Sequence, residues 1–207
     1  MKKFSGVGVA LVTPFDEVGH IDEKSLRNLV NYVIDRGVDY LVALGTTSEA
    51  ATMTAEERET VVNIVAEENA GRLPIVLGIG GNNTAQVVHD LSTLPYLKLG
   101  DAILSVVPYY NKPSQQGMYN HFKAIAENTP LPVILYNVPG RTSANMTAPT
   151  TLKLANDFDN IIAIKEASGN IEQASAIISK MPQNFILLSG DDALTLPLLA
   201  IGATGVI

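Results

Sequence analysis

The sequence has no cysteine and no long apolar run among its 207 residues. Without cysteine there can be no disulfide, no thiolate metal site and no thiol nucleophile, and the absence suits a reducing compartment such as the cytoplasm. A membrane span is not expected either, because that would need a stretch of about 18 apolar residues. Chemistry must therefore come from other side chains in a globular chain.

Basic residues are also scarce: 14 Lys and Arg stand against 21 Asp and Glu, which gives a net charge of -7. A nucleic-acid partner is not expected, because phosphate binding needs clustered Lys and Arg. The three histidines, His20, His89 and His121, are scattered without ligand spacing, which argues against a metal site. Since no glycine-rich stretch completes a dinucleotide fingerprint, no nicotinamide site is predicted.

Eight short apolar, β-branched segments recur along the chain, and helix-period segments separate them. The strand-like segments are residues 8–12, 40–44, 75–79, 102–107, 133–138, 161–165, 185–189 and 205–207. Residues suited to begin a helix precede the apolar stripes at Asp22, Thr54, Asn83, Ser114, Thr147 and Asn170. Thr54 and Glu57 also have the spacing of a capping box.

This alternation predicts a parallel sheet covered by helices, since parallel strands need a crossover. Eight strands in one series favour a (β/α)8 TIM barrel over a doubly wound sheet. We therefore predict one α/β domain over residues 1–207 that ends in strand eight and lacks the last barrel helix. Apolar residues such as Leu198 and Leu199 would then lose their cover, which favours self-association.

Lys165 is the first candidate for chemistry, because barrel active sites lie at the carboxyl ends of the strands. Strict alternation places it on the same face as Ala163 and Ile161. If that face is the barrel interior, desolvation lowers the pKa of the lysine and provides a nucleophilic amine. Snorkelling from the strand end, or pairing with Glu166, is an equally simple interpretation of the same position.

Other polar residues follow neighbouring predicted strands. The phenol of Tyr136 is suited to proton transfer, although a half-buried tyrosine is common in any core. Thr46 and Thr47 form a tight polar turn that suits a small carboxylate, or that serves only as a turn. Arg141 has the forked geometry for a second carboxylate, or lies free in a loop.

Five motifs at predicted strand ends together resemble the dihydrodipicolinate synthase / N-acetylneuraminate lyase family, over residues 6–207. They are Gly-Thr-Thr-Ser-Glu at 45–49, Pro-Tyr-Tyr-Asn at 108–111, Tyr-Asn-Val-Pro-Gly-Arg-Thr at 136–142, Lys-Glu-Ala-Ser-Gly at 165–169 and Ser-Gly-Asp-Asp at 189–192. The resemblance is specific because the motifs are separated and occur in order. It implies a lyase that forms a Schiff base with pyruvate.

The resemblance also implies individual roles. Lys165 would form the Schiff base, and Tyr136, Thr46 and Tyr110 would relay protons, with Tyr110 reaching in from a neighbouring subunit. Thr47 would bind the pyruvate carboxylate. The backbone at Gly190 and Ile207 would line the same pocket.

Arg141 and the paired threonines resemble the synthase branch, in which the arginine receives the carboxylate of L-aspartate 4-semialdehyde. That branch makes 4-hydroxy-tetrahydrodipicolinate for diaminopimelate and lysine biosynthesis, in the cytoplasm, as a homotetramer built from two dimers and without a cofactor. Ser48 departs from the family, which most often has glycine there, and serine would be strained if the turn needs a positive φ at that residue. The family's C-terminal helical extension is also missing from this sequence.

Two alternatives remain open at this point. An aldolase for N-acetylneuraminate or a 2-keto-3-deoxy sugar acid would share Lys165 and Tyr136 and differ at the second substrate. A catalytically silent barrel is the other alternative, and it would not form the Schiff base at all.

Overall fold

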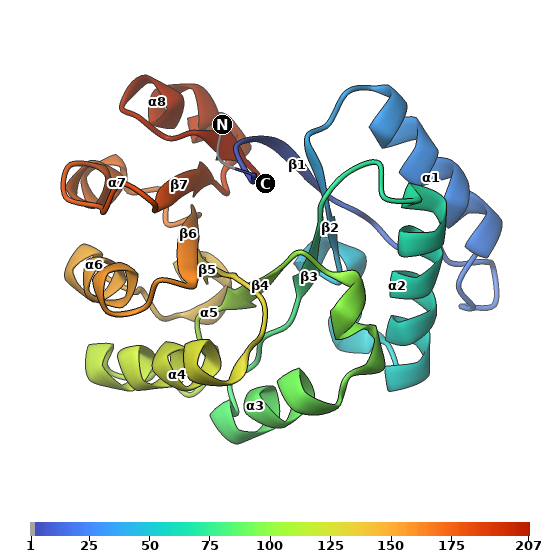
Figure 1. The fold of residues 1–207 in the computed structure, drawn as a ribbon, viewed down its shortest axis with the longest axis horizontal. Helices are drawn as coiled ribbons and strands as arrows, with labels where there is room; N and C mark the ends of the chain where they lie inside the picture. Colours follow the sequence, from blue (N-terminus) through green and yellow to red (C-terminus); the bar gives the residue numbers. More distant parts are fainter. Residues whose placement is uncertain (1–2) are drawn as a thin grey trace.

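The computed structural model describes residues 3–207. In that part of the chain, eight parallel strands pair in sequence order and β1 pairs with β8, so the sheet closes into a barrel (Figure 1). The strands are β1 Gly6–Ala10, β2 Tyr40–Ala43, β3 Ile75–Gly78, β4 Ala102–Val106, β5 Val133–Asn137, β6 Ile161–Glu166, β7 Ile186–Ser189 and β8 Gly205–Val206. The predicted (β/α)8 architecture is confirmed. The prediction for the first strand was two residues late, because its pairing with β8 begins at Gly6.

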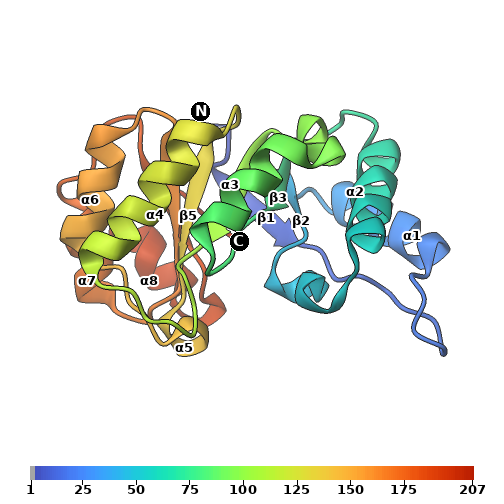
Figure 2. The same cartoon turned by 90° about the horizontal axis from the view of Figure 1, so that it is seen from below.

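Helices surround the barrel on the outside (Figure 1). They are α1 Glu23–Asp35, α2 Ala55–Asn69, α3 Thr84–Thr93, α4 Gln115–Asn128, α5 Pro139–Thr142, α6 Ala148–Asp157, α7 Ile171–Ile178 and α8 Thr195–Ala200. Among the described residues, none is long and apolar enough to cross a membrane. Figure 2 shows α5 and the turn after β2 on the same side of the barrel. That side is formed by the carboxyl ends of the strands.

The helix starts follow the predicted capping residues. Thr54 and Glu57 form the reciprocal capping box at α2, which satisfies two backbone donors of the first turn. Side-chain caps also begin four other helices, from Asp22, Asn83, Ser114 and Asn170. Thr147 precedes α6 but makes no such cap. Its hydroxyl donates instead to Oε1 of Gln115, 3.0 Å away.

Two apolar layers hold the barrel together, as the alternation of side chains along a strand requires. Ile134, Tyr136 and Ala163 face the interior. A larger layer fills the space between the strands and the helices, and it includes Ile161. The expectation that Ile161 shares a face with Lys165 is therefore wrong. The β5–β6 register shifts between Val133 and Ile134, so β6 has one extra residue near its start and the alternation restarts after it.

The region beside β8 matches the expectation only in part. No helix follows β8 within residues 3–207, and Figure 1 shows the C-terminal end lying between α8 and α1. Leu199 is 43% exposed as expected, and Val7 of β1 is similarly exposed. Leu198 is only 3% exposed, because it faces the strands from α8. The predicted loss of cover at Leu198 is therefore wrong.

His121 is a polar residue inside the outer apolar layer, on α4. Its Nδ1 lies 2.8 Å from the hydroxyl of Thr84, and its buried Nε2 has no hydrogen-bond partner. Burial lowers the pKa of the imidazole from 6.5 to about 4. The ring is therefore neutral at pH 7, and protonation is coupled to unfolding.

This coupling predicts acid sensitivity with a defined sign. The unfolded chain binds a proton at His121 below pH 6.5, whereas the folded chain does so only below about 4. The free energy of unfolding should therefore fall by roughly 3 kcal/mol from this group as the pH drops through that window. Urea unfolding of His121→Gln between pH 7 and 4 should lack this part of the decrease. The matched variant of the exposed His89, His89→Gln, should retain it; equal slopes for both variants would contradict the assignment.

Candidate active site

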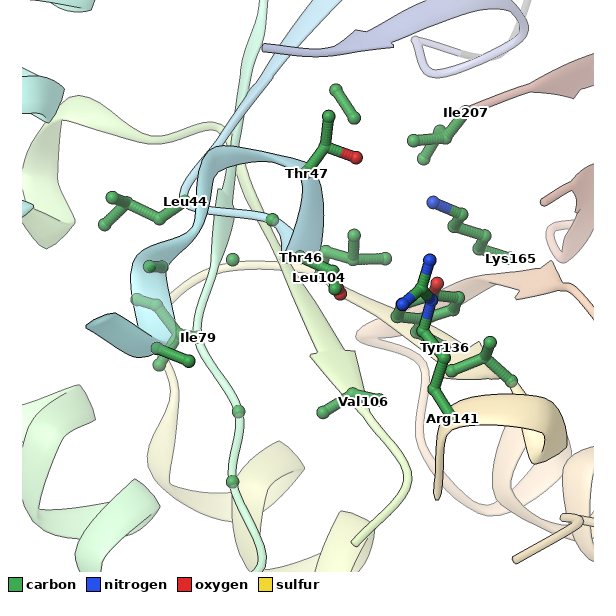
Figure 3. A pocket seen from close by; sticks show the side chains of 18 of the residues that line it. Leu44, Thr46, Thr47, Ile79, Leu104, Val106, Tyr136, Arg141, Lys165 and Ile207 are labelled. Carbon is green, nitrogen blue, oxygen red and sulfur yellow. The ribbon is translucent and has the colours of Figure 1, made fainter. Parts of the chain in front are cut away.

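A cavity of about 1190 Å³ opens at the carboxyl ends of the strands (Figure 3). The predicted site residues that line it come from β2, β5, β6, β7 and β8 or the turns after them: Thr46, Thr47, Tyr136, Arg141, Lys165, Gly190 and Ile207. Tyr110 is the predicted residue that does not line it. The fold therefore brings together residues that are up to 161 positions apart in the sequence, from Thr46 to Ile207.

Lys165 enters this cavity from the end of β6 (Figure 3). Its side chain is only 8% exposed, and Nζ lies 4.5 Å from the centre of the Tyr136 ring. Burial lowers the pKa of Lys165 from 10.5 to about 8; the charge of Asp192 opposes this shift, and that of Arg141 adds to it. About a tenth of the amine is therefore neutral at pH 7, far more than for an exposed lysine. This is the state that attacks a carbonyl carbon.

The two simpler interpretations of Lys165 do not hold. A snorkelling lysine would have an exposed end, whereas this side chain is buried. The carboxylate of Glu166 accepts hydrogen bonds from Asn137 and Gln173 on the opposite face of β6. Its charge is therefore not paired with Lys165.

Gly190 follows β7 directly beside Lys165. A Cβ atom at this position would lie 2.9 Å from Cγ and 3.0 Å from Cε of Lys165. Such contacts are too short for carbon atoms, and the lysine stem is packed among its neighbours. Because residue 190 has no side chain, the space that the Lys165 side chain occupies stays free.

Tyr136 shares the interior face of β5 with Ile134, as predicted. Burial raises the pKa of its phenol, while the charge of Arg141 and a hydrogen bond with the Thr46 side chain lower it. Burial has the largest effect, so the phenol keeps its proton at neutral pH. It can then donate that proton to a neighbouring oxygen and recover it through the hydroxyl of Thr46.

Thr46 and Thr47 belong to a short 3-10 turn, Thr46–Ser48, that follows β2. The left-handed residues flank this turn: φ is 57° at Leu44 and 61° at Glu49. The concern about Ser48 is therefore unfounded, because the positive φ lies one residue later. Ser48 is buried, and its hydroxyl donates to the carbonyl of Gly45 at 2.8 Å. The serine closes the turn that carries both threonines.

Arg141 lies on α5, which begins at Pro139 immediately after β5. Figure 3 shows its guanidinium beside the Tyr136 ring at the edge of the cavity. No hydrogen bond or ion pair among residues 3–207 occupies this guanidinium, so its donors are available to a ligand carboxylate. Its charge also lowers the pKa of both Lys165 and Tyr136.

Tyr110 and Asp192 lie in contrasting places. Tyr110 is 89% exposed and has a φ of 70° in the loop after β4, outside the cavity. Asp192 lines the cavity and its charge acts on Lys165, although the sequence gives no sign of this role. The Ser-Gly-Asp-Asp motif contains both aspartates, but it does not show that Asp191 caps the next turn while Asp192 lines the cavity.

The described residues contain no group of three His, Asp or Glu side chains close enough to hold a metal ion. Besides the amine of Lys165, the polar groups that line the cavity include the phenol of Tyr136 and the guanidinium of Arg141. The hydroxyls of Thr46 and Thr47 and the carboxylate of Asp192 line it as well. This set suits covalent chemistry on a carbonyl compound that carries a carboxylate.

Comparison with known proteins identifies the same family that the sequence motifs resemble. Residues 3–207 match the dihydrodipicolinate synthetase family. The chain is 56% identical to the 4-hydroxy-tetrahydrodipicolinate synthase of Flavobacterium psychrophilum over 207 residues, which is 100% of this chain and 70% of that protein. It is 47% identical to the Bacillus subtilis protein of the same name over 204 residues, with coverage of 99% and 70%.

Solved structures agree with these sequence matches. The dihydrodipicolinate synthase of Bacillus anthracis superposes with a TM-score of 0.94 at 45% identity, covering 100% of this chain and 70% of that one. The Aquifex aeolicus enzyme of that name gives 0.93 at 43% identity, with coverage of 99% and 69%.

The contact between Gly190 and Lys165 gives a direct prediction. Gly190→Ala should displace the lysine side chain toward solvent and raise its pKa from about 8 toward 10.5, because the added methyl occupies its path. The rate at which an amine-selective reagent labels Lys165, followed against pH by peptide mass spectrometry, measures this shift. Gly140→Ala is the matched control, since a Cβ at residue 140 meets no atom within 4 Å. An unchanged labelling profile in Gly190→Ala would refute the packing argument.

Proposed function

Because this chain belongs to the dihydrodipicolinate synthetase family, we propose that it condenses pyruvate with L-aspartate 4-semialdehyde to 4-hydroxy-tetrahydrodipicolinate, in the diaminopimelate route to lysine. One observation carries the chemical part of this proposal: a buried lysine amine with a pKa of about 8 faces a protonated phenol in a cavity with an unpaired guanidinium. The reaction needs a nucleophilic amine, a proton donor and carboxylate binding, and this cavity contains all three.

The first step is attack of the neutral Lys165 amine on the ketone carbon of pyruvate. The ketone oxygen takes up protons and leaves as water, which forms the iminium. Tyr136 supplies the proton, and the hydrogen bond with Thr46 provides a route to replace it. The turn that carries Thr47 holds the pyruvate carboxylate through hydroxyl and backbone N–H donors.

The second step makes the carbon–carbon bond. Loss of a methyl proton turns the iminium into an enamine, with the iminium nitrogen as the electron sink. The enamine carbon adds to the aldehyde carbon of the semialdehyde, and the aldehyde oxygen becomes the 4-hydroxyl. Arg141 binds the semialdehyde carboxylate through its forked guanidinium, which orients the aldehyde toward the enamine.

The last step releases the enzyme. The amine of the bound semialdehyde attacks the iminium carbon, closes the ring and displaces the Lys165 amine. None of these reaction steps requires an oxidant or a reductant. Gly190 and Ile207 line the cavity, and the missing side chain at Gly190 leaves room for the Lys165 stem.

We also propose that the enzyme is a cytoplasmic homo-oligomer, with the tetramer built from two dimers. The position of Tyr110 supports this arrangement: its side chain is 89% exposed and does not line the cavity of its own chain. A second copy that packs against the loop after β4 would receive this phenol. Tyr110 then completes the proton relay of the neighbouring subunit.

Reduction with borohydride in the presence of pyruvate tests the mechanism. We expect a covalent adduct on Lys165, located by peptide mass spectrometry, and none in Lys165→Ala. The variant should remain folded because the substitution removes a desolvated amine from the interior. A folded wild-type protein that traps no pyruvate would favour a catalytically silent barrel.

Turnover with different second substrates distinguishes the synthase from a sugar-acid aldolase. Pyruvate with L-aspartate 4-semialdehyde should give product, and cleavage of N-acetylneuraminate or a 2-keto-3-deoxy sugar acid should be far slower. The reason is the guanidinium of Arg141, which suits a carboxylate better than a sugar hydroxyl. Faster cleavage of a sugar acid would reverse the assignment.

A further inference from the structure

Glu166 is a buried carboxylate for which the mechanism above has no use. It follows Lys165 on β6, is only 3% exposed, and points to the face of the strand opposite the cavity. No cation pairs with it among the described residues. A buried charge is costly unless hydrogen bonds compensate for it, so this side chain requires an explanation.

Three donor groups surround the carboxylate. The backbone N–H of Ser168 donates to Oε1 at 2.7 Å, and Nε2 of Gln173 donates to Oε2 at 3.1 Å. Nδ2 of Asn137 lies 3.1 Å from Oε1 and 3.2 Å from Oε2. The carboxylate therefore joins β5, the turn after β6, and α7, which are separate segments of the chain.

The position of this cluster relative to the cavity is the informative point. In the β5–β6 register, Tyr136 pairs with Lys165, and the next pair is Asn137 with Glu166. Successive side chains on a strand point to opposite faces. The Asn137–Glu166 pair therefore lies directly behind the Tyr136–Lys165 pair, and both pairs share the same two stretches of backbone.

The backbone around this pair is held as well. The carbonyl of Asn137 accepts from the N–H of Ala167 at 2.8 Å, and the carbonyl of Glu166 accepts from the N–H of Gly190 at 2.8 Å. The side chain of Asn137 also accepts from the N–H of Met146 at 2.9 Å. Any movement of Glu166 is therefore passed to the ends of β5, β6 and β7, which carry Tyr136, Lys165 and Gly190.

We propose that Glu166 is a positioning residue for imine formation: its carboxylate fixes the ends of β5 and β6 so that the Lys165 amine stays over the Tyr136 ring. This inference rests on the proposed function. Glu166 does not touch the substrate and acts through the backbone that it shares with Lys165. The pKa of Lys165 is set by burial, Asp192 and Arg141, so an effect of Glu166 on the rate would come from geometry.

Glu166→Gln is the sharpest test, because it preserves the shape of the side chain while it replaces the carboxylate by a neutral amide and so changes the hydrogen-bonding pattern. The cluster consists of donors, and the amide of glutamine would turn its own N–H2 group toward one of them. We expect the rate of pyruvate imine formation, followed by borohydride quenching at saturating pyruvate, to fall by about 10²-fold, the effect of a misplacement near 1 Å. The KM for pyruvate should change little, because Thr46 and Thr47 lie on a different strand end.

Asn160→Ala provides the matched control at the opposite end of the same strand. Nδ2 of Asn160 donates to the carbonyl of Ala126 at 2.8 Å, so this variant also removes a side-chain hydrogen bond that holds β6. It should lower the melting temperature and leave the imine rate unchanged. If both variants lose rate in proportion to their loss of stability, Glu166 is only a structural residue and the proposal is overturned.

The pH profile separates positioning from an effect of charge. In Glu166→Gln the imine rate should still rise through the same pH as in the wild type, to a lower plateau. A shifted midpoint with an unchanged plateau would overturn the proposal. If Glu166→Gln does not fold, Gln173→Met removes one of the three donors and should give the same pattern with a smaller loss. A wild-type protein that traps no pyruvate would instead refute the proposed function itself.

Discussion

Desolvation of the Lys165 amine is the constraint on which the rest of the site depends. The side chain is 8% exposed, and its pKa falls from 10.5 to about 8. This shift corresponds to roughly 3 kcal/mol of preference for the neutral amine relative to an exposed lysine. An isolated apolar pocket would lower the pKa further, whereas the charge of Asp192 limits the shift. The amine is therefore mostly protonated at rest but available as a nucleophile.

The surrounding fold makes that burial possible. Gly190 leaves the space that the lysine stem fills, and the extra residue near the start of β6 sets which side chains face inward beyond it. Behind the strand, the amides around Glu166 satisfy the other buried charge without placing a cation there. The two faces of β6 thus carry opposite charges that are stabilised separately. Their separation keeps Lys165 free of a salt bridge.

Much of this arrangement is readable in the sequence, since it depends on local patterns. Hydrophobic periodicity and residue propensity predict the eight strands and the capping box at Thr54. The position of Lys165 at the end of a strand follows from the same pattern. The side of the sheet on which Ile161 lies could not be predicted, because one extra residue in β6 reverses the alternation of its side chains. The backbone conformation at Ser48 could not be predicted either, because the motif does not show that the left-handed residue is Glu49, one position later.

Long-range side-chain contacts are the other feature of the site that the sequence does not predict. Asn137, one donor to Glu166, is 29 positions away in the sequence, so only the folded chain reveals that contact. The motif also does not show that Asp191 caps a turn whereas its neighbour Asp192 lines the cavity. The exposed position of Tyr110 could not be derived from its spacing, and its role was inferred from the family resemblance.

The most direct test of the account is the pKa of Lys165 in the wild-type protein. Titration by nuclear magnetic resonance, with isotope-labelled lysine assigned by comparison with Lys165→Ala, measures it without any substrate. The account predicts a value of about 8, and a lower value in Asp192→Asn because a stabilising negative charge is removed. A wild-type value near 10.5, the ordinary pKa of lysine, would contradict the claim that burial prepares this amine for attack.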